Sequence, residues 1–139
     1  LGIRDSIKPD LAIAVDVGVA YDVPGMTSEK NQGNLGDGPL VTMMDATSIA
    51  HDGFRKHIKE VAEAHHIPVQ WATTPGGGTD AGSIHVANEG IPTITIGVPL
   101  RYMHSNVSVM HTDDYENSVQ LITVIVRSLK DDSYQSLMW

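Results

Sequence analysis

Three groups of polar residues in this sequence have the types and settings that metal or acyl chemistry uses. Asp16 interrupts the apolar run "LAIAVDV", His104 follows another apolar run in "RYMHS", and between them stands "PGGGTDAG", which contains Gly76, Gly77, Gly78, Thr79 and Asp80. A carboxylate and an imidazole are ligands for divalent metal ions. A glycine-rich turn that leads into a helix exposes backbone N–H groups, which can hold an anion or a carbonyl oxygen.

Taken singly, each group also has a plainer structural interpretation. A lone carboxylate in an apolar strand needs compensation, which an ion pair with Arg101 or a capping role would supply as well as a metal. A single loop histidine is more often structural than a ligand. The glycines suit a tight strand-to-helix connection, and no lysine follows them where a phosphate-binding P-loop requires one. These alternatives stay open at the level of single residues.

The surrounding sequence predicts an α/β fold that would position these residues. Apolar runs rich in Val, Ile and Ala predict strands at 11–17, 39–45, 67–73 and 91–98, and helical spacing predicts helices at 48–66, 80–88 and 113–129. Their alternation indicates a mainly parallel sheet with helices on both faces. In such sheets functional groups gather on loops beyond the carboxyl ends of the strands.

Three details of this scheme are testable against a structure. The continuous apolar run 11–17 predicts a strand that is buried on both faces. Asp113, with Glu116 three residues later, predicts a capping box that opens the last helix, with Val119, Ile122, Val126 and Leu129 facing inward. Asp80 is expected to be held by backbone N–H groups or by Thr79, shaping a pocket rather than binding a metal.

Composition limits the classes of function. The chain has 139 residues, enough for one domain, and 9 basic against 17 acidic side chains give a net charge of -8, which disfavours nucleic acid as a partner. Cysteine is absent, so there is no disulfide framework, which fits a reducing compartment. The longest apolar runs are far shorter than a membrane span, and no signal peptide is visible. The sequence therefore predicts a cytoplasmic protein without a membrane partner.

Several motifs together are more specific than any of them alone. In order along the chain they are "AVDV" (14–17), "YDVPG" (21–25), "LGDGP" (35–39), "GGGTDAGSIH" (76–85), "RYMHS" (101–105) and "DDYENSVQLI" (113–122). This set resembles the co-catalytic metallo-aminopeptidases of the glutamyl and deblocking type, also called tetrahedral aminopeptidases. The resemblance covers essentially the whole chain.

The resemblance implies a function and a role for each group. Asp16 and His104 match two of the five metal ligands of that family, one on each ion of a dinuclear zinc or cobalt site that activates a water molecule. Gly76, Gly77, Gly78, Thr79 and Asp80 match the lining of the substrate pocket. The substrates would be peptides, the fold a zinc-exopeptidase-like catalytic domain, and the full-length protein a homo-oligomer of between two and twelve copies.

One departure from the family pattern is large. The family's other three ligands and its general-base glutamate precede the "AVDV" strand, whereas only 15 residues precede Asp16 here and 1–10 contain no glutamate. Residues 1–139 are therefore expected to be the C-terminal portion of a catalytic domain, inactive alone, without the N-terminal half and the inserted dimerisation domain. Two alternatives remain: a glucanase-type glycoside hydrolase, a label that some family members carry, and a non-catalytic structural or oligomerisation module.

Overall fold

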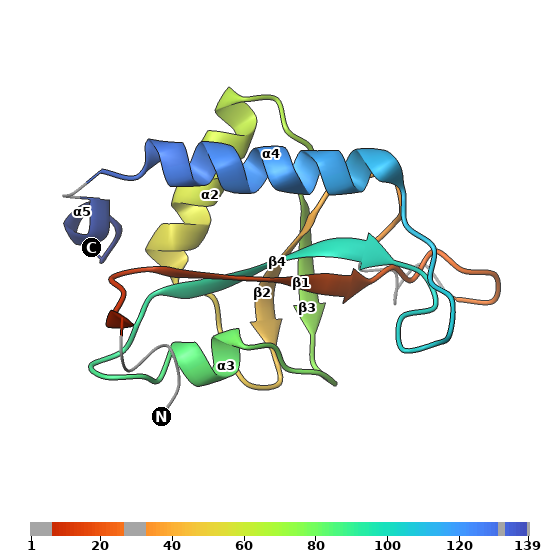
Figure 1. Cartoon of the computed structure of the whole chain (residues 1–139), viewed down its shortest axis with the longest axis horizontal. Coiled ribbons are helices and arrows are strands. Elements are labelled where there is room, and N and C mark those ends of the chain that lie inside the picture. Colours follow the sequence, from red (N-terminus) through yellow and green to blue (C-terminus); the bar gives the residue numbers. More distant parts are fainter. Residues whose placement is uncertain (1–6, 27–32, 131–132, 139) are drawn as a thin grey trace.

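A mixed, mostly parallel sheet of four strands forms the centre of the protein (Figure 1). The computed structural model describes residues 7–26, 33–130 and 133–138. In spatial order the strands are β1 (Ala12–Val19), β4 (Thr93–Leu100), β2 (Leu40–Asp45) and β3 (Gln70–Thr74). β1 is parallel to β4 and β2 to β3, while β2 and β4 are antiparallel. The predicted α/β class and the four predicted strands are confirmed.

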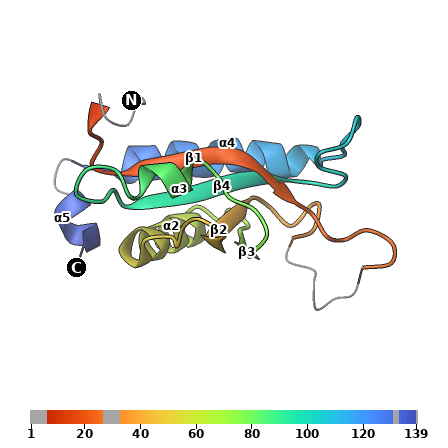
Figure 2. The ribbon, with the colours of Figure 1, turned by 90° about the horizontal axis from the view of Figure 1, so that it is seen from below.

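Helices cover both faces of the sheet, as predicted. α2 (Asp52–Ala64) and α4 (Thr112–Ser128) lie on one face, and the short α3 (Ala81–Ile84) lies on the other, against β1 and β4 (Figures 1 and 2). A final helix that the sequence did not predict, α5 (Ser133–Met138), packs against α2. Across the described ranges, no helix has the length and apolar character needed to span a bilayer.

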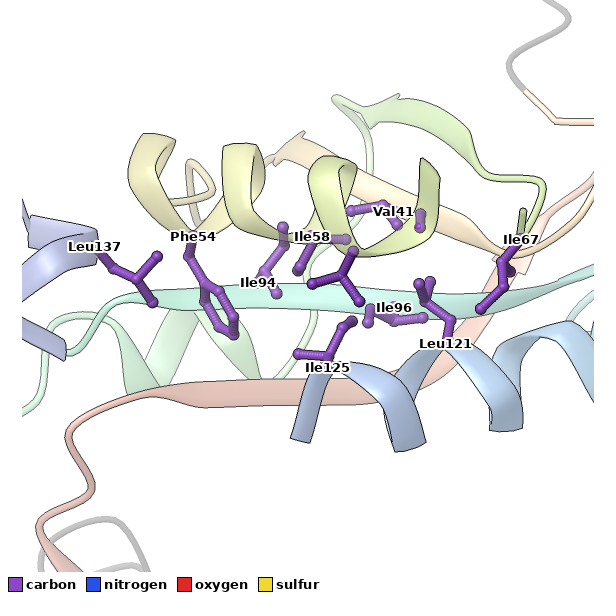
Figure 3. Close-up of a cluster of buried hydrophobic side chains, with 11 residues drawn as sticks. Val41, Phe54, Ile58, Ile67, Ile94, Ile96, Leu121, Ile125 and Leu137 are labelled. Carbon is purple, nitrogen blue, oxygen red and sulfur yellow. The ribbon is translucent and has the colours of Figure 1, made fainter. Parts of the chain in front are cut away.

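The core lies between β4 and the two long helices (Figure 3). Phe54 and Ile58 of α2 stand one turn apart, as do Leu121 and Ile125 of α4, so each helix presents one apolar stripe. Alternate residues of β4 point into the same layer. The core side chains come from α2, α4, β2, β4, α5 and the segment before β3: Val41, Phe54, Ile58, Val61, Ala62, Ile67, Ile94, Ile96, Leu121, Ile125 and Leu137.

The prediction that the first strand is buried on both faces is wrong. β1 is an edge strand whose neighbour on one side is β4, and in the described chain no strand pairs with its other side. Val15 is 63% exposed and Val17 40%. Ala14 of the same strand is buried, but in the described residues no strand or helix covers the side chains of Val15 and Val17.

The predicted start and inward face of the last helix also need correction. α4 begins after His111, whose ring Nδ1 accepts a hydrogen bond from the backbone N–H of Asp113, so His111 is the N-cap in place of Asp113. The buried face consists of Asp114, Ser118, Leu121 and Ile125. Val119 and Val126, predicted to face inward, are 50% and 58% exposed. Apolar residues occupy more than one side of this helix, and the packing of α4 onto β4 decides which side is buried.

Candidate metal centre and substrate cavity

One cavity of about 190 Å³ brings the three chemically interesting groups together. Asp16 reaches it from β1, His104 from the loop after β4, and Gly77, Gly78 and Thr79 from the loop after β3. Gly76 and Asp80 are not part of its lining. The remaining wall comes from all four strands and the loop after β4: Val17, Gly18, Val19, Thr42, Asp45, Thr74, Thr95, Gly97 and Met103.

Asp16 is open to the cavity because of its register in the sheet. It stands opposite Gly97 of β4, which has no side chain to cover it. A Cβ at Gly97 would lie 3.2 Å from the backbone N of Gly18, so this close approach of the two strands also favours glycine. Asp16 is exposed, and its Oδ1 accepts a hydrogen bond of 2.7 Å from the backbone N–H of Val17. The alternative in which Arg101 neutralises Asp16 is wrong, because Arg101 pairs with Asp22.

A tightly closed loop holds His104. The backbones of Arg101 and Val109 exchange hydrogen bonds of 2.9 and 3.1 Å, which bring the two ends of the loop together. Within it, Tyr102 and His104 have φ angles of 61° and 66°, in the left-handed region. Non-glycine residues in that region cost about 1–3 kcal/mol each and cluster at functional sites. The positive φ of His104 therefore indicates a functional role, which the sequence alone could not show.

An ion pair joins the His104 loop to the loop after β1. Arg101 Nε donates to Asp22 Oδ1 at 3.0 Å, and Arg101 Nη2 donates to Asp22 Oδ2 at 2.5 Å. The Arg101 guanidinium lowers the pKa of Asp22, an effect that burial partly opposes and the N–H of Leu35 reinforces. The same pair raises the pKa of Arg101. The pair therefore ties the loop that follows β1, the strand of Asp16, to the loop that contains His104.

A second brace connects α4 to the "LGDGP" segment. Asp114 is fully buried, and its two carboxylate oxygens accept from the N–H groups of Gly36 at 2.7 Å and Gly38 at 2.8 Å. The sequence did not predict the bonding partners of Asp22 or Asp114. Their presence inside the motifs "YDVPG" and "DDYENSVQLI" was the only available signal, and it could not show which atoms they bind.

Asp45, at the end of β2, is a buried acid in the cavity wall that sequence reasoning also missed. Its Oδ1 accepts from the N–H and hydroxyl of Thr47 and from the N–H of Ser48, at 2.7–2.9 Å. Its Oδ2 accepts from the hydroxyl of Thr79 at 3.1 Å, and this hydroxyl also lies 2.8 Å from that of Thr95. Burial acts to raise the pKa of Asp45, but the hydrogen bonds from Thr47 and Ser48 outweigh it and the pKa lies below its usual value. The ionised carboxylate of Asp45 thus holds the glycine loop in place through Thr79.

The predicted capping role of Asp80 is wrong. The Asp80 side chain makes no capping hydrogen bond to α3 and is exposed, while its backbone carbonyl accepts from the N–H groups of Ser83 and Ile84. The N–H groups that a capping side chain would bind are already occupied, because Gly82 donates to the carbonyl of Thr79 and Ser83 donates to that of Asp80. Thr79 makes the buried contacts at this point, through its hydroxyl.

The donor types in the cavity fit a divalent metal, but the donor number does not complete a site. Carboxylate and imidazole are ordinary zinc ligands, and a catalytic zinc normally has three protein ligands and one water. Within the described part of the chain, no group of three or more His, Asp or Glu side chains converges in a way that could hold an ion. Asp16 and His104 could therefore supply only part of a metal site.

Comparisons with known proteins point to one family. The M42 glutamyl aminopeptidase family matches residues 2–121. The glutamyl aminopeptidase of Lactococcus lactis is 34% identical over 125 residues, which are 90% of this chain and 34% of that protein. The lysyl aminopeptidase of Pyrococcus furiosus is 32% identical over 135 residues, which are 94% of this chain and 38% of that protein.

Solved structures agree with the sequence relatives. An aminopeptidase of the archaeon Desulfurococcus kamchatkensis superposes with a TM-score of 0.94 at 34% identity, covering 98% of this chain and 39% of its own. A Thermotoga maritima protein described as an endoglucanase superposes with a TM-score of 0.67 at 30% identity, over 89% of this chain and 36% of its own. The TET1 peptidase of Pyrococcus horikoshii is described as assembling into a tetrahedron or a large octahedral shell; its TM-score is 0.68 at 28% identity, over 85% of this chain and 34% of its own.

The chain spans little more than a third of the length of these relatives. Within that span the match is nearly continuous, the fold agrees, and the shared region contains the cavity with Asp16, His104 and the glycine loop. The chain belongs to the M42 glutamyl aminopeptidase family.

Proposed function

We propose that this chain is the C-terminal portion of the catalytic domain of a metal-dependent aminopeptidase that removes N-terminal residues from peptides. One observation carries the proposal: Asp16 and His104, from distant parts of the sequence, line one cavity together with the glycine loop. A carboxylate and an imidazole that face one cavity are donor types that a divalent metal ion takes. Family membership supplies the chemistry, because M42 peptidases are metal-dependent.

Each group then has a role. Asp16 and His104 would each hold one of two divalent ions, zinc or cobalt, and such a pair would supply Lewis-acid activation of a water molecule and of a substrate carbonyl group. Gly76, Gly77, Gly78, Thr79 and Asp80 form the loop along which the substrate peptide lies. Thr79 is held by Asp45 and Thr95, so the loop is oriented before any substrate arrives.

The chain by itself is inactive under this proposal. It offers one ligand to each ion, against the three protein ligands of a usual catalytic zinc site. Among the described residues that line the cavity there is no glutamate to serve as general base, and loss of such a group costs about 10²–10⁴-fold in rate. The remaining ligands and the base belong to the rest of the protein, which we propose assembles as a homo-oligomer.

The glucanase alternative has one supporting observation, the description of the Thermotoga maritima relative. Glycoside hydrolysis requires two carboxyl groups, one of them a general acid with a raised pKa. Asp16 and Asp45 both line the cavity, but the pKa of Asp45 is lowered and its two oxygens already accept hydrogen bonds. Asp45 is therefore unsuited to donate a proton to a sugar. Aminopeptidase chemistry needs no such acid from this chain.

The test is a chimera in which this chain replaces the corresponding region of the Desulfurococcus kamchatkensis aminopeptidase. We expect it to hydrolyse leucyl, glutamyl or lysyl anilides with added zinc or cobalt, while the isolated chain does not. Asp16→Asn and His104→Ala should each lower kcat/KM by at least about 10²-fold, since each removes a protein side chain that would bind a catalytic ion.

His66→Ala is the matched control, because His66 is also exposed and also has a positive φ, of 55°, but lies outside the cavity. Its kcat/KM should stay within about twofold of the parent. Full activity in the Asp16→Asn chimera would overturn the metal assignment. A folded chimera without activity on any anilide would favour the non-catalytic module.

A further inference from the structure

The loop that carries His104, residues 101–109, is not held in place by apolar burial. The side chains of Tyr102, Val107 and Val109 are all exposed. The positive φ angles of Tyr102 and His104 add a cost of about 1–3 kcal/mol each. The conformation of this loop therefore depends on its hydrogen bonds.

One group of these hydrogen bonds lies inside the loop. The carbonyl of Tyr102 accepts from the N–H of Ser105 at 3.2 Å, from the hydroxyl of Ser105 at 2.6 Å and from the hydroxyl of Ser108 at 3.3 Å. Together with the backbone pair that joins the two ends of the loop, these bonds close the turn around His104. Because they connect one part of the loop to another, they determine its shape but not its position beside the cavity.

The side chain of Arg101 joins this loop to the loop that follows β1. Its Nε and Nη2 donate to the two carboxylate oxygens of Asp22, and a contact at two points fixes orientation as well as distance. The two side chains are 34% and 19% exposed, so the ion pair is partly shielded from water. Figure 1 shows both loops at the same end of the sheet, beyond the ends of the parallel strands β1 and β4.

The support behind Asp22 continues into the core. Its Oδ2 also accepts from the N–H of Leu35 at 3.2 Å. The next residue, Gly36, donates its N–H to the buried carboxylate of Asp114 on α4 at 2.7 Å. α4 is itself held by its apolar side chains in the core. A series of contacts thus runs from the core through α4 to Asp22, and from there through Arg101 to the loop of His104.

We propose that Arg101 and Asp22 are positioning residues, whose ion pair places the His104 loop so that the imidazole faces the same cavity as the carboxylate of Asp16. Neither is among the described residues that line the cavity, so both act through the loop rather than by touching an ion or a substrate. The placement of His104 stands on the contacts of this chain alone. Its effect on metal binding and catalysis rests on the proposed function.

The first test needs neither metal nor activity. Residual dipolar couplings of backbone N–H groups, measured by NMR on this chain, report whether residues 102–108 keep a fixed orientation to the core. We expect these couplings to fit the same alignment as the core in the parent and to shrink toward zero in Asp22→Asn and Arg101→Gln. The double variant should lose no more than either single variant, because the two side chains act through each other.

Asp52→Asn is the matched control. Asp52 on α2 also forms an ion pair with an arginine, Arg55, but is not among the described residues that line the cavity. Its substitution should leave the couplings of residues 102–108 unchanged. Circular dichroism of each variant verifies the fold, so that a loss of loop orientation is not mistaken for unfolding.

The second test uses the chimera with the Desulfurococcus kamchatkensis aminopeptidase. Asp22→Asn and Arg101→Gln should each raise the dissociation constant for cobalt and lower kcat by about 10–100-fold, the usual effect of losing a group that orients a metal ligand. KM should stay within about twofold, since neither side chain touches the substrate. Arg101→Lys keeps the charge but not the two-point contact, so its kcat should fall between those of the parent and Arg101→Gln.

Couplings that keep their parent values in both single variants would overturn the proposal. So would a loss of loop orientation that leaves cobalt affinity and kcat unchanged, because the ion pair would then be structural only. A folded parent chimera without activity would refute the proposed function, while the couplings would still decide whether the ion pair places His104.

Discussion

At the residue scale, what distinguishes the candidate ligands is how they are held. His104 sits in a loop closed by backbone bonds between Arg101 and Val109 and has a strained φ. Asp16 is opposite a glycine, so its carboxylate is uncovered. Asp22, Asp45 and Asp114, by contrast, have their oxygens bound by arginine, hydroxyl or backbone N–H groups. The oxygens of these three acids are occupied, whereas the Asp16 carboxylate is exposed and remains accessible to an ion.

Weak metal binding by the isolated chain should depend on these two residues. We expect calorimetric titration with zinc or cobalt to show only weak binding, since the chain offers one protein ligand to each ion, fewer than a catalytic set. Asp16→Asn or His104→Ala should reduce the association constant at least about tenfold, and His66→Ala should leave it unchanged. Tight binding of two ions per chain would show that the ligand assignment is wrong.

The Asp22–Arg101 pair should contribute a stability that depends on pH. The folded-state pKa of Asp22 is lowered, so its ionised form stabilises the folded chain above the unfolded pKa of about 3.9, and that contribution is lost as pH falls through the folded-state pKa. Asp22→Asn should cost about 1 kcal/mol at pH 7, a figure reduced for partial exposure. Urea unfolding at pH 7 and pH 3 should show this difference shrinking. Glu60→Gln, an exposed acid on α2, should show neither effect.

At the scale of elements, the β3–α3 connection is shaped by its contact with the β2–α2 connection. A Cβ at Gly78 would lie 2.7 Å from the Thr47 side chain, and one at Gly82 would collide with it. Thr47 cannot turn aside freely, because Asp45 binds its hydroxyl at 2.9 Å. The glycines are therefore required by packing at Gly78 and Gly82, while Gly76 has open space around it.

This contrast predicts opposite effects from two alanine substitutions. Gly78→Ala should destabilise the chain by about 1–3 kcal/mol through overpacking. Gly76→Ala should be neutral or stabilising by up to about 1 kcal/mol, because it restricts the unfolded chain without a clash. Thermal and urea unfolding of the two variants measure both values. Equal destabilisation would mean that the loop is not fixed against Thr47.

At the scale of the whole molecule, the last described helix completes the core. Leu137 of α5 is buried beside Phe54 and the other core residues (Figure 3). α5 lies so close to the start of α2 that a Cβ at Gly53 would overlap the carbonyl group of Leu137. The C-terminal segment is therefore part of the folded unit rather than a tail.

Leu137→Ala should accordingly cost about 2–5 kcal/mol, the usual range for removing a buried leucine side chain. Ile49→Ala, at an exposed site, should change the free energy of unfolding by no more than about 0.5 kcal/mol. Chemical denaturation followed by circular dichroism is the measurement. A Leu137→Ala variant as stable as the parent would place α5 outside the cooperative core.

By itself, the sequence determined the fold class, the four strands, the helices α2 and α4, and the candidate groups Asp16, His104 and the glycine loop. The spacing of apolar residues, the turn residues and the motifs can all be recognised in the sequence without knowledge of distant contacts. Tertiary structure alone decided that β1 is an edge strand, that Val119 and Val126 face outward, and that Leu137 enters the core. It also decided that Asp45 rather than Asp80 holds the glycine loop. An apolar side chain or a carboxylate reads the same in a sequence wherever it lies; only contacts between distant segments determine whether it is covered, paired or left open to a ligand.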